Sequence, residues 1–297
     1  MFDVVVVGGG PAGLSAALML GRCRRSVLVC DLGEPRNRRS TELHGYLTRD
    51  GIAPLELNAL GRCELRKYGV EMRTIGVTGA RWEHDRFRVA LGDGGETTAR
   101  YLLIATGVID ALPAITGFDE CYGRSAFHCP YCDGWEQRDR RLAVFGEGQH
   151  AAGLALGLKT WSRDIVVCTH GARVSRVLAG RLARNGIAIR REPIVRLEHD
   201  DGALREIVFA SGEPVPRDAM FFTTSQRPQC DLAIKLGCEL TRRGTVKTGT
   251  LSETNVQRVF VAGDASRDAQ FVVVAAAEGV KAAMAINKAL QAEELIQ

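Results

Sequence analysis

The N-terminal segment constrains the fold more than any other part of the chain. Residues 2–7 form an apolar, β-branched run that predicts a buried strand, and residues 14–20 have the spacing of a buried helix. The turn between them reads Gly-x-Gly-x-x-Gly. In this pattern Gly8 permits a tight turn, Gly10 lets the backbone approach a pyrophosphate, and Gly13 lets helix and strand pack closely. The phosphates then lie at the positive end of the helix, so the sequence predicts a dinucleotide site.

Further strand ends add candidate groups to this site. Residues 26–30 predict a second strand, and Asp31 follows it directly, where a carboxylate can accept hydrogen bonds from both hydroxyls of a ribose. Two later apolar strands end in Ala105-Thr106-Gly107 and in Gly263-Asp264. Parallel strands carry their carboxyl ends at one edge of a sheet, so these turns predict a dinucleotide lying across that edge.

The strand–turn–helix pattern occurs a second time near the middle of the chain. Residues 141–145 predict a strand, residues 151–159 a helix and residues 164–168 another strand. The turn inside this unit has a Gly-x-Gly-x-x-Ala skeleton, formed by Gly146, Gly148 and Ala151. We therefore predict an α/β fold with two Rossmann-like, three-layer dinucleotide-binding domains.

The remaining apolar runs complete these two predicted sheets. Residues 70–90 predict antiparallel strands and residues 92–95 a turn. Residues 101–104 and 259–262 predict buried strands, and residues 272–290 predict a long alanine-rich helix.

Composition excludes several classes of partner. A net charge of +4, from 39 basic and 35 acidic groups, is too balanced to favour nucleic acid or an anionic membrane. Residues 4–21 are long enough to span a membrane, but glycines interrupt them and Asp3 precedes them, so we predict soluble core. Nine cysteines, an odd number without a secretory signal, favour a reducing cytoplasm over a disulfide framework.

The sequence Cys129-Pro-Tyr-Cys132-Asp133 carries the predicted chemistry. Two thiols at this spacing can close a small disulfide ring, and one is usually a stabilised thiolate near neutral pH. A zinc site would need a second cysteine pair or suitably spaced histidines, which the chain lacks, so we predict a redox dithiol and no metal. An inert pair is the remaining alternative. Asp133 could exchange a proton with the departing thiol if burial raises its pKa, or could cap a helix.

Along the chain, the flavin-type signature is followed by the Cys-x-x-Cys-Asp sequence and the second glycine turn. With these motifs in this order, the chain resembles an atypical branch of the low-molecular-weight thioredoxin reductases. The resemblance covers nearly the whole chain. It implies an FAD domain made of residues 1–113 and 238–297, with an inserted nucleotide-binding domain over residues 114–237 that carries the cysteines. It also implies that Cys132 faces the flavin and that Cys129 attacks the substrate disulfide, with Asp133 as the acid–base.

The resemblance further implies which residues bind cofactors. Asp264 would bind the ribityl chain of FAD, and Gln270 falls where family members touch the flavin ring. Asn37 and His44 lie where the family's chain passes near FAD, although a turn-forming Asn explains Asn37 equally well and a loop histidine is the simpler explanation of His44. The predicted FAD set is Gly8, Gly10, Pro11, Ala12, Gly13, Asp31, Asn37, His44, Ala105, Thr106, Gly107, Gly263, Asp264 and Gln270, and Gly146, Gly148 and Ala151 form the second site.

The second site departs from the family pattern. NADPH-dependent members hold the 2′-phosphate with a His-Arg-Arg run and a further arginine, whereas this chain has Thr-His-Gly-Ala over residues 169–172. Arg173 and Arg176 could substitute only if their loop folds back, and Glu147 adds a carboxylate beside the pyrophosphate position. NADPH is therefore disfavoured, and NADH, ferredoxin and a second flavin stay open.

The leading prediction is an FAD-dependent disulfide oxidoreductase of the thioredoxin reductase type. Its partner would be a thioredoxin-like protein or a small disulfide or dithiol, and the family habit implies a cytoplasmic homodimer. The alternatives are a dithiol oxidase that uses oxygen and a flavin redox sensor without turnover. Known dithiol oxidases often carry His at the position of Asp133, which favours the reductase slightly.

Overall fold

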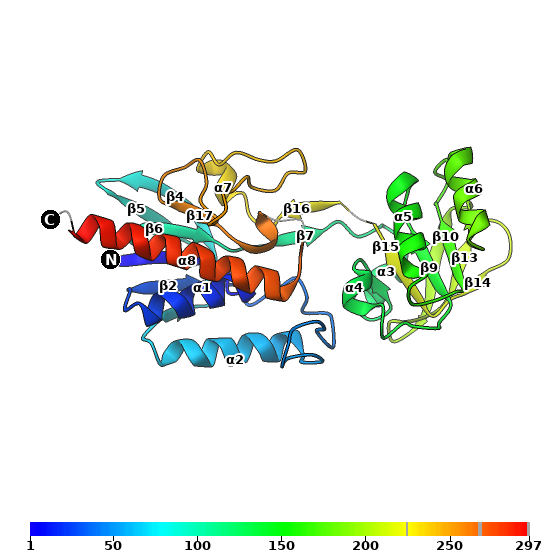
Figure 1. Cartoon of the computed structure of the whole chain (residues 1–297), viewed down its shortest axis with the longest axis horizontal. Helices are drawn as coiled ribbons and strands as arrows, with labels where there is room; N and C mark the ends of the chain where they lie inside the picture. Colours follow the sequence, from blue (N-terminus) through cyan, green and yellow to red (C-terminus); the bar gives the residue numbers. More distant parts are fainter. Residues whose placement is uncertain (224, 267–268, 296–297) are drawn as a thin grey trace. The chain divides into compact units, whose positions relative to one another are not determined.

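The computed structural model describes residues 1–223, 225–266 and 269–295, and its chain forms two compact units (Figure 1). Unit 1 comprises Met1–Arg38, Ile52–Ile109 and Gln226–Gln297. Unit 2 comprises Arg39–Gly51 and Asp110–Ser225. Each unit has its own sheet and its own pair of apolar cores.

A mostly parallel sheet forms the centre of unit 1. Its order is β3-β2-β1-β6-β5-β4, and β17 pairs with β6 as well. Its strands are β1 (Phe2–Val7), β2 (Val27–Cys30), β3 (Glu71–Arg73), β4 (Val77–Glu83), β5 (Arg86–Leu91), β6 (Glu96–Ile104) and β17 (Val259–Val261). Only the pairs β4–β5 and β5–β6 are antiparallel among the described strands of this sheet. The β-branched and apolar residues of β1 are buried on both faces, as a central parallel strand requires.

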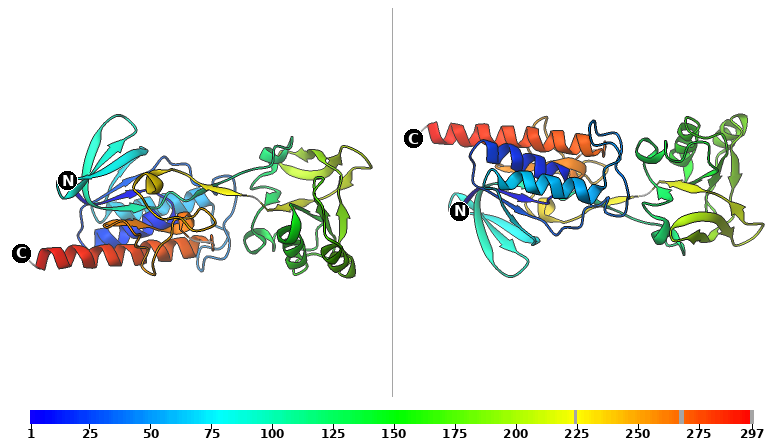
Figure 2. Two further views of the ribbon diagram at one scale, coloured as in Figure 1. Left: turned by 90° about the horizontal axis from the view of Figure 1, so that it is seen from above. Right: turned by 90° about the horizontal axis from the view of Figure 1, so that it is seen from below.

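Three helices cover one face of this sheet. They are α1 (Pro11–Arg22), α2 (Pro54–Arg66) and α8 (Val272–Leu295), and both views of Figure 2 show α1 beside α8. These two helices pack closely at a glycine, because a Cβ on Gly279 would lie 2.0 Å from the carbonyl oxygen of Ala12. The short helix α7 (Leu232–Lys235) contributes Leu232 and Ala233 to the core on the other face.

A parallel sheet of order β11-β10-β9-β15-β8 forms the centre of unit 2. Its strands are β8 (Ala126–Phe127), β9 (Leu142–Phe145), β10 (Ile165–Cys168), β11 (Ala188–Arg190) and β15 (Ala219–Phe222). The helices α5 (Gly148–Leu158) and α6 (Arg176–Arg184) contribute to the core on one face. The other core contains residues of α3 (Phe118–Cys121), β12 (Ile194–Asp200), β13 (Ala203–Phe209) and β14 (Val215–Pro216).

The shorter elements complete the chain. Helix α4 (Pro130–Asp133) carries the cysteine pair, and a 3-10 turn, η1 (Gly263–Ala265), follows β17. Strand β7 (Val108–Asp110) pairs with β16 (Gln226–Pro228). No helix of the described residues is both long and apolar enough to cross a membrane.

The predicted α/β class with two Rossmann-like domains is confirmed, whereas the chain boundaries differ from the predicted ones. The chain passes into unit 2 after Ile109 and returns to unit 1 at Gln226, earlier than the predicted boundaries at residues 113 and 237. The early return follows from burial, because Leu232 and Ala233 lie in a core of unit 1. The segment Arg39–Gly51 belongs to unit 2, which the sequence pattern did not indicate.

Candidate functional site

The first glycine turn leaves space directly above the N-terminus of α1. Gly8 has a φ of 106°, and a Cβ there would lie 2.4 Å from the carbonyl oxygen of Ala105. A Cβ on Gly13 would lie 1.9 Å from the carbonyl oxygen of Gly8, so these two positions require glycine. At Gly10, the N-cap before Pro11, a Cβ would meet nothing within 4 Å, and no described side chain caps the helix. An open cradle at a helix N-terminus fits the pyrophosphate of FAD.

Asp31 lies beside this turn at the end of β2. Its Oδ1 accepts a hydrogen bond from the Gly9 amide at 3.0 Å, and its Oδ2 forms an ion pair with the guanidinium of Arg62 from α2. The sequence did not identify Arg62, because its pairing depends on where α2 packs. The predicted ribose-binding role of Asp31 stays a prediction.

Asp264 and Gln270 meet at an arginine that sequence analysis missed. The Nη1 of Arg36 lies 3.1 Å from the Oδ2 of Asp264 and donates to the Oε1 of Gln270 at 2.7 Å. The side-chain amides of Gln270 and Gln226 exchange hydrogen bonds of 2.7 and 2.9 Å. The only sequence signal for Arg36 was its position next to Asn37, which lies half-buried in the same turn.

The strand-end turns converge on the glycine cradle. The amide of Ala105 donates to the carbonyl of Val7 at 2.8 Å, which continues the β1–β6 pairing into the turn before Thr106 and Gly107. A Cβ on Gly263 would lie 3.1 Å from the Cβ of Ala12. Unit 1 therefore brings most of the predicted FAD set together, with His44 as the exception.

The cysteine pair lies at the N-terminus of the short helix α4 in unit 2. Cys129 is the N-cap of α4, and its Sγ accepts a hydrogen bond from the amide of Cys132 at 3.1 Å. The two residues form a disulfide with a Cα–Cα distance of 5.3 Å. No group of three or more His, Cys, Asp and Glu among the described residues could hold a metal ion. The neighbouring Tyr131 is 77% exposed, so the helix that carries the pair has an accessible face.

Asp133 ends α4 and is half-buried. Burial, followed by the charge of Glu136, raises the pKa of Asp133 to about 7, against the opposing influence of His44. Asp133 is not the N-cap of this helix, because Cys129 takes that position. A carboxyl group that titrates near neutral pH beside a cysteine can hold a proton for a departing thiolate.

His44 lies in unit 2, within the segment Arg39–Gly51. Its Nε2 is 3.6 Å from the Oε1 of Glu136. Its side chain therefore belongs with the group around Asp133, and its predicted contact with FAD stays a prediction. Glu136 gave no sequence signal of its own.

The second glycine turn follows β9. Gly146 has a φ of 149°, and a Cβ there would lie 2.2 Å from the Oγ1 of Thr223, while Gly148 has a φ of 57°. The exposed Glu147 is the N-cap of α5 without a side-chain cap hydrogen bond, and Ala151 is buried beneath the turn. The skeleton is thus intact, and the Glu147 carboxylate is solvated.

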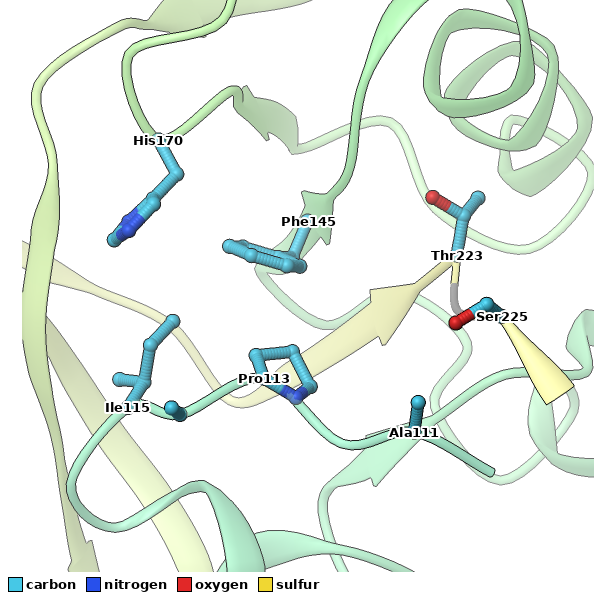
Figure 3. A pocket seen from close by; sticks show the side chains of 8 residues that line it. Ala111, Pro113, Ile115, Phe145, His170, Thr223 and Ser225 are labelled. Atoms are coloured by element: carbon cyan, nitrogen blue, oxygen red, sulfur yellow. The ribbon is translucent and has the colours of Figure 1, made fainter. Parts of the chain in front are cut away.

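A pocket of about 340 Å³ lies at the carboxyl ends of β9, β10 and β15 (Figure 3). Its lining residues come from three strand ends and the segment before α3: Ala111, Pro113, Ala114, Ile115, Phe145, His170, Thr223 and Ser225. The rings of Phe145 and His170 lie edge to face with centroids 5.8 Å apart. The carboxyl ends of parallel strands are where nucleotides bind in this fold class.

His170 occupies the turn after β10, where a 2′-phosphate would be held. Its Nδ1 accepts a hydrogen bond from the amide of Ile194 at 3.0 Å. The guanidinium of the nearby Arg190 pairs with Glu192 at 3.1 Å and stacks over Phe209 at 4.2 Å, so a carboxylate already compensates its charge. The turn thus presents an imidazole instead of a guanidinium pair.

Comparison with known proteins gives matches over the whole chain. Residues 2–279 match the family model of the pyridine nucleotide-disulphide oxidoreductases. The thioredoxin reductase sirT of Leptosphaeria maculans is 31% identical, over 97% of this chain and 94% of that protein. The putative thioredoxin reductase TrxB from Bacillus anthracis is 33% identical with a TM-score of 0.95, over 99% of this chain and all of that one. The solved structure of HlmI is 36% identical with a TM-score of 0.95, over 99% and 94% of the two chains.

Proposed function

The chain belongs to the pyridine nucleotide-disulphide oxidoreductase family, and we propose that this thioredoxin reductase-like flavoenzyme passes electrons through Cys129 and Cys132 to an external disulfide. The observation that carries the proposal is the Cys129–Cys132 disulfide on α4, with Asp133 beside it titrating near neutral pH. A structural disulfide needs no acid whose pKa is tuned to about 7, whereas thiol–disulfide exchange uses one.

Unit 1 supplies the groups that would hold FAD. The cradle at Gly10 would take the pyrophosphate, and Asp31 and Asp264 would accept hydrogen bonds from hydroxyls of the cofactor. Arg36 would compensate the charge of Asp264. When bound, FAD supplies the two-electron couple that reduces a cysteine pair.

In the exchange step, the Cys129 thiolate bonds to one sulfur of the substrate and breaks its S–S bond. The departing sulfur leaves with the electron pair and takes the proton of Asp133. The Asp133 carboxylate then takes the proton of the Cys132 thiol, whose thiolate attacks the Cys129 sulfur. The Cys129–Cys132 disulfide forms again, and the second departing sulfur takes this proton. The substrate gains two electrons and two protons, and Asp133 is left ionised.

An NADH-linked cycle is the proposed source of electrons. NADH lacks the 2′-phosphate, so it needs no guanidinium pair after β10, where this chain carries His170. Anaerobic titration of the flavin-loaded protein is expected to bleach the oxidised flavin band with NADH at least about tenfold faster than with NADPH.

Each other outcome of this titration has a defined meaning. Faster bleaching by NADPH would contradict the proposal and indicate that Arg173 or Arg176 reaches the site. If neither nucleotide bleaches the flavin while dithiothreitol does, the donor is ferredoxin, or the second site holds a flavin.

The substrate is proposed to be a thioredoxin-like protein or a small disulfide. The exposed Tyr131 beside the pair, and Trp135 with the Arg138 guanidinium 4.3 Å above its ring, offer a contact face for either. Peroxide release from a small dithiol in oxygen would favour the dithiol oxidase instead, and flavin reduction without turnover would favour the sensor. We also propose a cytoplasmic location and a homodimer, and sedimentation of the flavin-loaded protein tests the homodimer.

Replacing Asp133 with Asn should slow reduction of an alkyl disulfide by about 10²–10⁴-fold. The acid form of Asp133 donates the proton, so the wild-type rate should fall as pH rises through about 7, the pKa of this group. The amide of the Asp133→Asn variant cannot titrate, so the decrease in rate with rising pH should disappear when the variant is measured by stopped flow over a series of pH values. If the variant keeps this decrease, another group causes it.

A further inference from the structure

A group of charged side chains around His44 is not used by the steps above. The Nε2 of His44 lies 3.4 Å from the Oε2 of Glu42 and 3.6 Å from the Oε1 of Glu136, and its Nδ1 lies 3.6 Å from the Oδ1 of Asp50. The His44 side chain is only 18% exposed, whereas Glu42 and Asp50 are mostly solvated. The imidazole therefore stands between solvated carboxylates and the more buried Glu136.

The loop around His44 is fixed by its own hydrogen bonds. The amide of Gly51 donates to the carbonyl of Leu43 at 2.9 Å, and the amide of Gly45 donates to the Oδ1 of Asp50 at 2.8 Å. These bonds close the loop on both sides of His44. The backbone from which the His44 side chain projects is therefore held in place.

Glu136 presents one oxygen to His44, and its second oxygen has no partner among the described residues. Its Oε2 is buried and makes no hydrogen bond with any described residue. A buried carboxylate oxygen without a donor costs free energy, so this atom is available to accept a hydrogen bond. Glu136 follows Asp133 by three residues, in the turn after α4, and its charge acts on the Asp133 carboxyl group.

Asp133 must regain a proton in every cycle. The exchange step leaves it as a half-buried carboxylate, and the charged groups that act on it are Glu136, from the turn after α4, and His44. Two carboxyl groups at one site favour the state in which they hold a proton between them. Glu136 and His44 thus lie between Asp133 and the solvated carboxylates of Glu42 and Asp50.

We propose that Asp133 and Glu136 share one proton and that His44, which orients Glu136, returns it from solvent after each disulfide exchange. The proposal rests on the proposed function and adds two positioning residues to it, since Glu136 and His44 act on the substrate only through Asp133. The proton moves from His44 to the Glu136 carboxylate and from there to Asp133, and His44 is recharged from water beside Glu42 and Asp50. No electron moves in this step.

The shared proton can be tested without turnover. An infrared pH titration of the oxidised protein should show the band of a protonated carboxyl group that disappears in Asp133→Asn. In Glu136→Gln the band should titrate about one pH unit lower, because the negative charge that raises the pKa of Asp133 is removed. In His44→Gln it should move to higher pH, because the opposing charge is lost. Glu120→Gln, at an exposed position of α3, is the charge-matched control.

Two substrates then separate the proton path from the cysteine chemistry. The flavin-loaded protein, reduced anaerobically with dithionite, is mixed with bis(hydroxyethyl) disulfide or with a bis(nitrobenzoate) disulfide, whose thiolate leaves without a proton. Above about pH 7, Glu136→Gln and His44→Gln should each reduce the first substrate about tenfold more slowly and the second within about twofold of wild type.

Several outcomes would overturn one proposal or the other. If both variants reduce both disulfides at the wild-type rate, or if their infrared bands move in the same direction, the relay is wrong while the proposed function stands. If the wild-type protein reduces neither disulfide, the proposed function fails, and the infrared titration still decides whether the proton is shared.

Discussion

Cys132→Ser is expected to lose disulfide turnover by at least about 10³-fold and to accumulate a mixed disulfide on Cys129. Cys129 is the N-cap of α4 beside the exposed Tyr131 and can still attack a substrate. Without the Cys132 thiol, the S–S bond between Cys129 and the substrate cannot be resolved. Intact-protein mass spectrometry of the reduced variant, mixed with bis(hydroxyethyl) disulfide, should show one added hydroxyethyl thiol per chain.

Cys129→Ser should lose turnover to the same degree without trapping the substrate. Both single variants lack the disulfide that links these residues, so the difference between them isolates which thiol attacks. Cys63→Ser is the matched control, since Cys63 is an exposed free thiol in α2. If dithiothreitol reduces the flavin of Cys132→Ser as fast as that of wild type, the assignment of Cys132 to the flavin is wrong.

The second large effect is expected at the glycine cradle, where two alanine substitutions should act differently. Gly13→Ala places a Cβ 1.9 Å from the backbone oxygen of Gly8, so α1 and β1 must separate. The free energy of unfolding of the cofactor-free protein should fall by about 1–3 kcal/mol, toward the upper end of that range. Flavin content per chain should fall with it, because the cradle is distorted.

Gly10→Ala meets no atom within 4 Å, so the cofactor-free protein should keep its stability within about 1 kcal/mol. Its methyl group would occupy the space of the pyrophosphate, so FAD affinity should drop by about tenfold or more. Gly153→Ala, at an open position of α5, is the control and should stabilise by about 0.5–1 kcal/mol. All three variants are compared by thermal unfolding with and without FAD and by the flavin content per chain. Unchanged FAD affinity in Gly10→Ala would place the pyrophosphate elsewhere.

The sequence alone predicted the two nucleotide-binding folds and the pairing of Cys129 with Cys132, because both depend on residues close together in the chain. Gly13 must be glycine because a Cβ there would meet the carbonyl oxygen of Gly8 within one strand–turn–helix unit, and Cys129 and Cys132 can bond because one helical turn separates them. Hydrophobic periodicity likewise predicted β1 with its observed bounds, and α1 and α8, which the structure extends by a few residues.

Only the tertiary structure decided which distant charges meet. Arg36 reaches Asp264, 228 residues away, and Arg62 of α2, which packs against α1, reaches Asp31 at the end of β2. His44 lies next to Glu136 because the segment Arg39–Gly51 belongs to unit 2, a placement that no local pattern encodes. The raised pKa of Asp133 follows first from its burial in the folded unit and then from the charge of Glu136, while the charge of His44 opposes the rise. Periodicity and turn chemistry act over a few residues, whereas the electrostatics of the site depend on the packing of whole elements.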